Sequence, residues 1–213
     1  MSQYHLGINM GHDRSVAIVK DGEILVAIEQ ERIDRQKHSV GFMLQSPDDL
    51  QQIQIPEEGI TYCLDTLGID MSDISTITAN MPGNDFAPDI LERRFTKSNI
   101  SKILRIQSHH LAHAYSAFIP SGFDNSLVLV ADASGSTIST SEGRYTESYT
   151  LYLGSGKTIT PIHSEKVKAH LSTLSTLGFI YEEVSRRAGF VTKLDSGLSF
   201  PEAGKLMGLA AYG

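Results

Sequence analysis

Three of the chain's eight histidines lie within five positions, in the stretch SHHLAHA at 108–114. In a helix, side chains four positions apart share a face, with β-carbons roughly 5–6 Å apart. His109 and His113 therefore have the spacing of a helical metal-binding pair, and His110 with His113 is the alternative pair. Two histidines normally need a third ligand, often a carboxylate. The same spacing also allows a helix cap or a polar core in which the histidines bond one another.

A second polar group lies in the stretch GINMGHDRS at 7–15. Gly11 and the backbone amides of this turn, which also holds Asp13, could approach phosphate oxygens closely, and His12 could polarise the bound group. An ordinary tight turn would explain the same residues.

The stretch DASGS at 132–136 occupies the equivalent turn of a repeated unit, after the apolar run SLVLVA. Its candidate phosphate contacts are Asp132, Gly135 and Ser136. Two such turns that face each other across a cleft would bind a nucleoside triphosphate and its metal.

Positive charge also lies near the first turn, just beyond the run EILVAIE. This basic cluster is a solvated face or a means of neutralising bound phosphate, and it comprises Arg32, Arg35, Lys37 and His38. Near the other end, EAGKLMGLAAYG at 202–213 contains Lys205 in either a flexible anion-contacting segment or the start of a helix. The chain has no P-loop, GxGxxG or GxSxG pattern, which excludes several common enzyme classes.

The composition limits the class of protein. With 213 residues, 40% of them hydrophobic, the chain can bury a real core in one large domain or one and a half smaller ones. Its net charge of −7 argues against a nucleic-acid partner. The single cysteine, Cys63, excludes a disulfide framework and a Cys-rich zinc site. With no targeting segment and no run of about 18 apolar residues, we expect a cytoplasmic protein without a membrane partner.

The elements that must position these residues begin with three short runs rich in valine and isoleucine. Strands are predicted at 4–9, 15–20 and 23–29, the last two joined by the hairpin turn Asp21-Gly22. A long polar surface excursion follows over 36–55. Helical spacing and turn residues then predict a helix over 57–67, a strand over 74–79, a helix over 88–95, a strand over 102–107 and a helix that Ser108 caps.

The pattern then starts again, with strands predicted at 126–132, 148–154 and 158–164 and a helix at 170–188. The order βββαβαβα followed by βββα predicts an α/β fold with mixed sheets and duplicated lobes. The first lobe would span 1–122, and 123–213 would begin a second lobe that lacks its later elements. We therefore expect the chain to be part of a longer protein.

Taken together, the motifs resemble the O-carbamoyltransferases of nodulation-factor and antibiotic biosynthesis. The resemblance covers 7–38, 108–136 and 202–213, in that order. It implies actin/sugar-kinase-like duplicated lobes, akin to those of the enzymes that make threonylcarbamoyladenosine in tRNA. It also implies that ATP and carbamoyl phosphate are converted into carbamoyl adenylate, from which the carbamoyl group passes to a hydroxyl of a small-molecule acceptor.

The resemblance also implies roles for individual residues. His109 and His113 would hold a divalent metal, iron before Mg²⁺, Mn²⁺ or Zn²⁺, and His12 and Lys37 would handle carbamoyl phosphate. Arg32 and Arg35 would help to hold the substrate phosphate. The implied nucleotide and phosphate contacts are Gly11, Asp13, Asp132, Gly135, Ser136 and Lys205.

The sequence departs from the family pattern at two positions. Ala133 stands where a glycine commonly follows the aspartate, and Ala203 separates a glutamate from a glycine that are usually adjacent. The family's third metal ligand, an aspartate, and most of its adenosine pocket would lie after residue 213, so this chain alone is expected to be inactive. A non-catalytic ATP-binding regulatory module and a tRNA-modifying enzyme are the alternatives.

Overall fold

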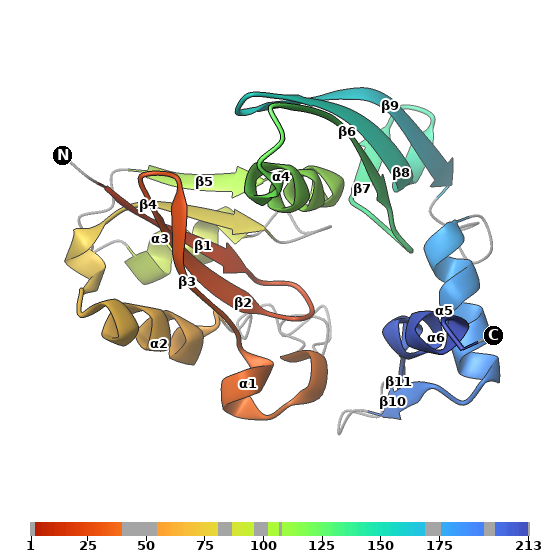
Figure 1. Ribbon diagram of the computed structural model, residues 1–213, viewed down its shortest axis with the longest axis horizontal. Coiled ribbons are helices and arrows are strands. Elements are labelled where there is room, and N and C mark those ends of the chain that lie inside the picture. The colour runs from red at the N-terminus through yellow and green to blue at the C-terminus, as the bar shows by residue number, and fades with distance from the viewer. Residues whose placement is uncertain are drawn as a thin grey trace. The chain divides into compact units, whose positions relative to one another are not determined.

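The computed structural model describes residues 3–39, 55–80, 87–95, 102–106, 108–168, 176–193 and 199–212. The chain forms two compact units, Met1–Ile106 and Gln107–Gly213 (Figure 1). Each unit is an α/β structure built on its own sheet, so the predicted class is confirmed. Among the described residues, no helix is both long and apolar enough to cross a membrane.

The first unit contains a five-stranded mixed sheet with the order β3-β2-β1-β4-β5. Its strands are β1 (Tyr4–Asn9), β2 (Ser15–Lys20), β3 (Glu23–Glu29), β4 (Ile74–Asn80) and β5 (Lys102–Ile106). The first three are antiparallel, whereas β4 and β5 run parallel to β1. Asp21 and Gly22 both have positive φ, as the predicted two-residue hairpin turn requires. The order of these strands and of the longer helices between them agrees with the order predicted from the sequence.

One face of this sheet is covered by two helices, α2 (Glu57–Leu67) and α3 (Ala87–Phe95) (Figure 1). The core that they form with the strands contains Leu6, Ile8, Val16, Ile18, Ile60, Cys63, Ile77, Leu91 and Phe95. Cys63 is fully buried, and burial raises the pKa of its thiol to about 11, so it is a core residue rather than a reactive thiol. Gly68 ends α2 in the left-handed conformation, as the sequence predicted.

A compact strap follows β3 and consists of α1 (Glu31–Asp34) and the 3₁₀ turn η1 (Lys37–Ser39). The polar excursion predicted over 36–55 is seen only at 36–39 and 55, and the rest lies outside the described residues. A second 3₁₀ turn, η4 (Met71–Asp73), leads into β4 and is capped by Asp70.

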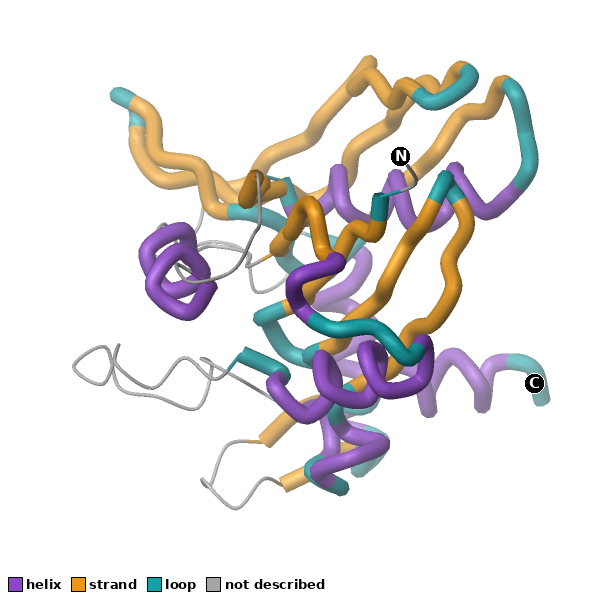
Figure 2. Tube along the Cα trace, turned by 90° about the vertical axis from the view of Figure 1, so that its left-hand side faces the viewer, coloured by secondary structure: helices purple, strands orange, loops and turns teal. Residues whose placement is uncertain are grey.

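The second unit is built on the long strand β8 (Gly143–Ser155). Strands β6 (Asn125–Ala131) and β7 (Thr137–Thr140) pair with successive parts of one edge of β8, and β9 (Thr158–Lys168) pairs along the other edge. All of these pairs are antiparallel and form a curved layer (Figure 2). The three predicted strands are confirmed. Strand β7 was not predicted, because its short polar hairpin with β8 lacks apolar alternation.

Helix α4 (His109–Ser121) packs on one face of this second sheet. It buries Ala114 and Phe118 against Val128, Val130 and Tyr152. Ser108 caps the helix as predicted, since its Oγ accepts a hydrogen bond from the Leu111 amide at 3.1 Å. The lobe boundary at 122/123 stays a prediction, and by packing α4 belongs to the second unit.

The end of the chain contains α5 (Leu177–Arg187), β10 (Val191–Lys193), β11 (Ser199–Pro201) and α6 (Ala203–Ala210). Helix α5 begins later than the predicted residue 170, because Thr176 caps it by accepting from the Phe179 amide at 3.2 Å. Residues 170–175 lie outside the described part of the chain. Helix α6 confirms the interpretation of 202–213 as the start of a helix.

The packing of β8 on α4 generates a first prediction. A Cβ added at Gly154 would lie 2.6–2.8 Å from three ring atoms of the buried Phe118. Overpacking of this kind costs about 1–3 kcal/mol, so Gly154→Ala should lower the free energy of unfolding by that amount in urea titrations. Gly208→Ala, whose methyl would meet nothing within 4 Å in α6, should raise it by about 0.5–1 kcal/mol. Wild-type stability in Gly154→Ala would show that this contact is not tight.

Candidate functional site

The first turn of α4 brings two imidazoles together. The Nε2 atoms of His109 and His113 are 3.0 Å apart, and the ring centroids lie 4.4 Å apart in an edge-on arrangement. Two imidazole nitrogens at this distance either share a proton or bind a common electrophile. The predicted HxxxH pair is therefore formed.

Asp132 joins this pair from the end of β6. Its Oδ2 lies 2.7 Å from Nε2 of His109 and 3.8 Å from Nε2 of His113. Its Oδ1 accepts a hydrogen bond from the Ala133 amide at 2.6 Å, which fixes the carboxylate. A carboxylate thus completes a triangle of three donor atoms, which we name the His–His–Asp cluster.

The His–His–Asp cluster fits a divalent metal ion. Zinc binds histidine nitrogen and carboxylate oxygen at about 2.0–2.2 Å, which places tetrahedral donors about 3.3–3.6 Å apart. The separations of 2.7, 3.0 and 3.8 Å bracket that range. The same donor set also suits non-haem iron. Among the described residues this is the group of histidine and carboxylate side chains whose donor atoms converge in this way.

The resemblance implies a third metal ligand after residue 213 and a phosphate contact for Asp132, and both stay predictions. The structure places Asp132 beside both histidines. Burial alone would raise the pKa of Asp132, but the hydrogen bond and charge of His109, helped by the Ala133 amide, lower it below its ordinary value of 3.8. The carboxylate is therefore held in its ionised, metal-binding form.

His110, the alternative metal ligand, lies in the core and outside the His–His–Asp cluster. Its ring is fully buried, and its Nδ1 lies 2.9 Å from Oγ1 of Thr150. A Cβ on Gly135 would lie 2.7–2.8 Å from the ring, so the absence of a side chain at Gly135 makes room for it. Burial is the main cause that lowers the pKa of His110, so the ring is neutral. The three histidines thus separate into a pair and a core residue.

The His–His–Asp cluster opens to a hollow. A groove of about 320 Å³ runs between α4 and β6, and His113 and Asp132 form part of its lining. The remainder of the lining is Ser116, Ala117 and residues 128–131. A small ligand could therefore reach both side chains.

Gly135 and Ser136, predicted as phosphate contacts, hold the start of α4. The Ser136 hydroxyl accepts a hydrogen bond from the His109 amide at 2.9 Å, and the Gly135 amide donates to the Glu147 carbonyl at 2.9 Å. The buried Glu147 carboxyl accepts from the Ser136 amide at 3.0 Å and from the Ser108 hydroxyl at 3.1 Å. Sequence reasoning missed Glu147, because its hydrogen-bond partners lie 11 and 39 positions away in the chain.

In the first unit, Asp13 joins two histidines. Its Oδ2 lies 2.5 Å from Nδ1 of His12, and its Oδ1 lies 2.9 Å from Nδ1 of His38. Although burial alone would raise the pKa of Asp13, hydrogen bonds to the two rings lower it below its ordinary value. Asp13 thus orients His12, and the phosphate contact that the resemblance implies for it stays a prediction.

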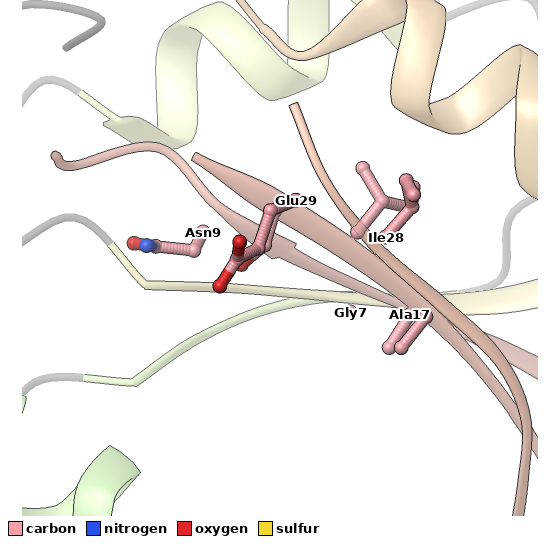
Figure 3. A pocket seen from close by; sticks show the side chains of 8 residues that line it. Gly7, Asn9, Ala17, Ile28 and Glu29 are labelled. Atoms are coloured by element: carbon pink, nitrogen blue, oxygen red, sulfur yellow. The ribbon is translucent and has the colours of Figure 1, made fainter. Parts of the chain in front are cut away.

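The turn that carries His12 is built on Asn9. The Asn9 side chain donates to the carbonyls of His12 and Asp13, both at 3.0 Å, and accepts from the Gly11 amide at 3.2 Å. Asn9 also lines a hollow of about 300 Å³ on the sheet face opposite the core (Figure 3). The small residues Gly7 and Ala17 form part of its floor.

The predicted basic cluster is paired with acids. Arg32 lies 3.3 Å from Glu29, and Nζ of Lys37 lies 3.8 Å from Glu31. Arg35 is exposed at the left-handed end of α1. The side chains of Lys37 and Arg32 are 49% and 64% exposed, so these pairs are weak and a phosphate could compete for them.

Arg14 anchors the strap that carries Lys37 and His38. Its guanidinium is buried and donates to the Ser39 carbonyl and hydroxyl, both at 2.9 Å, and to Asp34 at 3.4 Å. The charge of Asp34 raises the pKa of Arg14, but burial outweighs it and lowers that pKa. The strap holds His38 at φ 63°, a strained backbone that such anchoring maintains.

Lys205 lies on the helix α6. Its Nζ is 3.9 Å from Oε1 of Glu202, and the side chain is largely exposed. Glu202 is itself buried and accepts from the Thr192 hydroxyl. The predicted phosphate contact of Lys205 stays a prediction.

A comparison with known proteins identifies the family of the chain. A family model described as carbamoyltransferase N-terminus matches residues 4–84 and 74–213. The chain belongs to this family. The match takes in His12, the strap, the His–His–Asp cluster and α6, and it confirms the resemblance given by the sequence motifs.

Several relatives match nearly the whole chain. Nodulation protein NolNO of Sinorhizobium fredii is 30% identical over 226 residues, which cover 95% of this chain and 28% of that protein. Uncharacterized protein sll1178 of Synechocystis sp. is 30% identical over 239 residues, which cover 95% of this chain and 33% of that protein. Uncharacterized protein MJ1051 of Methanocaldococcus jannaschii is 25% identical over 207 residues, which cover 97% of this chain and 33% of that protein. The chain therefore spans about a third of the length of these relatives.

Among solved structures, YeaZ from Pseudomonas aeruginosa matches with a TM-score of 0.42 and 12% identity, over 78% of this chain and 66% of that chain. A protein from the same organism, described as similar to peptidase YEAZ, matches with a TM-score of 0.45 and 12% identity, over 78% of this chain and 67% of that chain. At these TM-scores the matches add nothing to the functional argument.

The lowered pKa of Asp132 generates a prediction for the chelator-treated chain. A carboxylate whose pKa is lower in the folded chain than in the unfolded chain stabilises the folded state at pH values above its ordinary pKa of 3.8. This stabilisation is lost as the pH falls through the lowered pKa. Asp132→Asn should cost about 1 kcal/mol near neutral pH, and the difference from wild type should shrink below about pH 4. Urea unfolding across this range measures it.

The matched background is the double variant His109→Gln, His113→Gln, which removes both histidines that lower the pKa of Asp132 and leaves the Ala133 amide in place. In this background, Asp132→Asn should change the free energy of unfolding by less than it does in the wild type, and the change should depend little on pH. A difference from wild type that is equally large in acid and at neutral pH would show that these histidines do not hold the carboxylate.

Proposed function

We propose that this chain forms the substrate-activating part of an ATP-dependent O-carbamoyltransferase. In the proposed reaction, water hydrolyses carbamoyl phosphate to carbamate and phosphate, and a carbamate oxygen then attacks the α-phosphorus of ATP, with loss of pyrophosphate. The carbamoyl adenylate so formed would transfer its carbamoyl group to a hydroxyl of a small-molecule acceptor, with loss of AMP. Family membership supports the carbamoyl chemistry, and the His–His–Asp cluster is the observation that carries the proposal.

The His–His–Asp cluster suits a divalent cation that gathers ATP phosphates. A bound cation would offset the negative charge of the phosphates and stabilise the charge that develops as pyrophosphate leaves. In this chain His109, His113 and Asp132 would hold it, with iron as the first candidate. Asp132 is held in the ionised form that metal binding requires. The groove beside His113 and Asp132 gives the phosphates room to approach.

His12 would handle the proton when carbamoyl phosphate is cleaved. Its Nδ1 shares a hydrogen bond with Asp13, so when Nδ1 carries the proton, Nε2 is the nitrogen that can accept one. A carboxylate behind a histidine favours this orientation and stabilises the imidazolium that forms. Asp13 and His38 are therefore proposed as positioning residues for His12.

Lys37 and the arginines of the strap would bind the phosphate of the same substrate. The contact that the structure describes between Lys37 and Glu31 is long and half-exposed, so Lys37 can turn to an anion at small cost. Its place in the strap, beside His38, brings it close in sequence and structure to the Asp13 network. We expect this chemistry to take place in the cytoplasm.

Binding of carbamoyl phosphate tests the proposal directly. A ligand present at about 100 times its Kd adds about 2.7 kcal/mol to the stability of the form that binds it. Carbamoyl phosphate titrated into the full chain should therefore raise its Tm. His12→Asn and Lys37→Ala should each abolish most of this rise, because they remove the proposed proton acceptor and the proposed phosphate ligand.

Lys102→Ala is the matched control, since Lys102 is an exposed lysine on β5 of the same unit. Its Tm should rise with carbamoyl phosphate as in the wild type. A chain stabilised by ATP but not by carbamoyl phosphate would contradict the transferase and favour the ATP-binding regulatory module.

A further inference from the structure

We infer that Glu147 is a positioning residue for the metal-binding pair, an inference that rests on the proposed function. Glu147 lies in β8 at the point where pairing passes from β6 to β7, and the register of β8 with β9 shifts there. Such irregularities in a ladder aim a side chain away from the regular alternation. Here they aim a carboxyl group at the start of α4.

Glu147 ties together the two segments that carry the metal ligands. Its carboxyl accepts the Ser108 hydroxyl at 3.1 Å and the Ser136 amide at 3.0 Å. Ser108 caps α4, and the Ser136 hydroxyl accepts the His109 amide at 2.9 Å. The carboxyl is thus one hydrogen bond from the helix cap and two from the backbone of His109.

The main chain of Glu147 holds the same turn. Its carbonyl accepts from the Gly135 amide, and its amide donates to the Ser136 carbonyl at 3.2 Å. The next carbonyl, that of Ser148, accepts from the Asp132 amide at 3.3 Å. One short piece of β8 therefore sets the position of Asp132 and, through its side chain, that of His109.

A buried carboxyl group costs free energy unless hydrogen bonds and charge compensate it. Glu147 is 6% exposed, and its compensation comes from donors at the positive end of α4. A contact that served only to pack the sheet could be made by an apolar side chain. The carboxyl instead fixes the relative positions of His109 and Asp132, on which a common cation would depend.

The test is a Zn²⁺ titration of the full chain by competition with a colorimetric chelator, with the Tm of the metal-free protein measured in parallel. Loss of residues that orient metal ligands typically weakens affinity about 10- to 100-fold. We expect that range for Glu147→Ala and about threefold for Glu147→Gln, whose amide can still accept from Ser136. Ser136→Ala, which removes the acceptor of the His109 amide, should weaken binding about tenfold.

Thr150→Val is the matched control. It removes the hydrogen bond to the buried His110, so it should lower the Tm but leave Zn²⁺ affinity within about twofold of wild type. A fall in affinity with Thr150→Val as large as that with Glu147→Ala would show that affinity follows stability alone, and would overturn the inference. If Glu147→Ala does not fold, Glu147→Gln and Ser136→Ala decide in its place.

The outcomes separate this inference from the proposed function. Wild-type affinity in folded Glu147→Ala, or in Glu147→Gln and Ser136→Ala together, would overturn the positioning role and leave the proposed function standing. A wild-type chain that takes up no Zn²⁺ would overturn both.

Discussion

The candidate metal site depends on where and how helix α4 begins. The Ser108 cap, the Ser136 hydroxyl on the His109 amide and the Glu147 carboxyl behind both serines fix the first turn of the helix. Once that turn is fixed, helical geometry brings His113 to His109, and the turn after β6 brings Asp132 to both. Three donor atoms from two segments thus converge because one hydrogen-bond network holds both segments.

The first unit uses a related device at a different site. A carboxylate, Asp13, lies between the rings of His12 and His38, and Asn9 and Arg14 hold the turn and the strap that carry them. In each unit, imidazoles bond the acid and keep it ionised despite its burial, and at Asp132 the Ala133 amide contributes. A carboxylate that orients histidines is suited to proton transfer when nothing else is bound, and to metal binding when the imidazoles converge.

The sequence predicted the parts of the fold and site that local spacing determines. The hairpin at Asp21-Gly22, helix 57–67 and the pairing of His109 with His113 depend on residues close in the chain. The approach of Asp132 to that pair depends on the register of β6 against β8 and on the packing of α4, which are non-local. Glu147 was missed for the same reason, since its importance comes from contacts 11 and 39 positions away.

A diffraction experiment at the zinc absorption edge tests the central claim most directly. Crystals of the full chain grown with Zn²⁺ should show an anomalous peak about 2.0–2.2 Å from Nε2 of His109, Nε2 of His113 and a carboxylate oxygen of Asp132. Zinc bound at other side chains, with no peak among these three, would contradict the account.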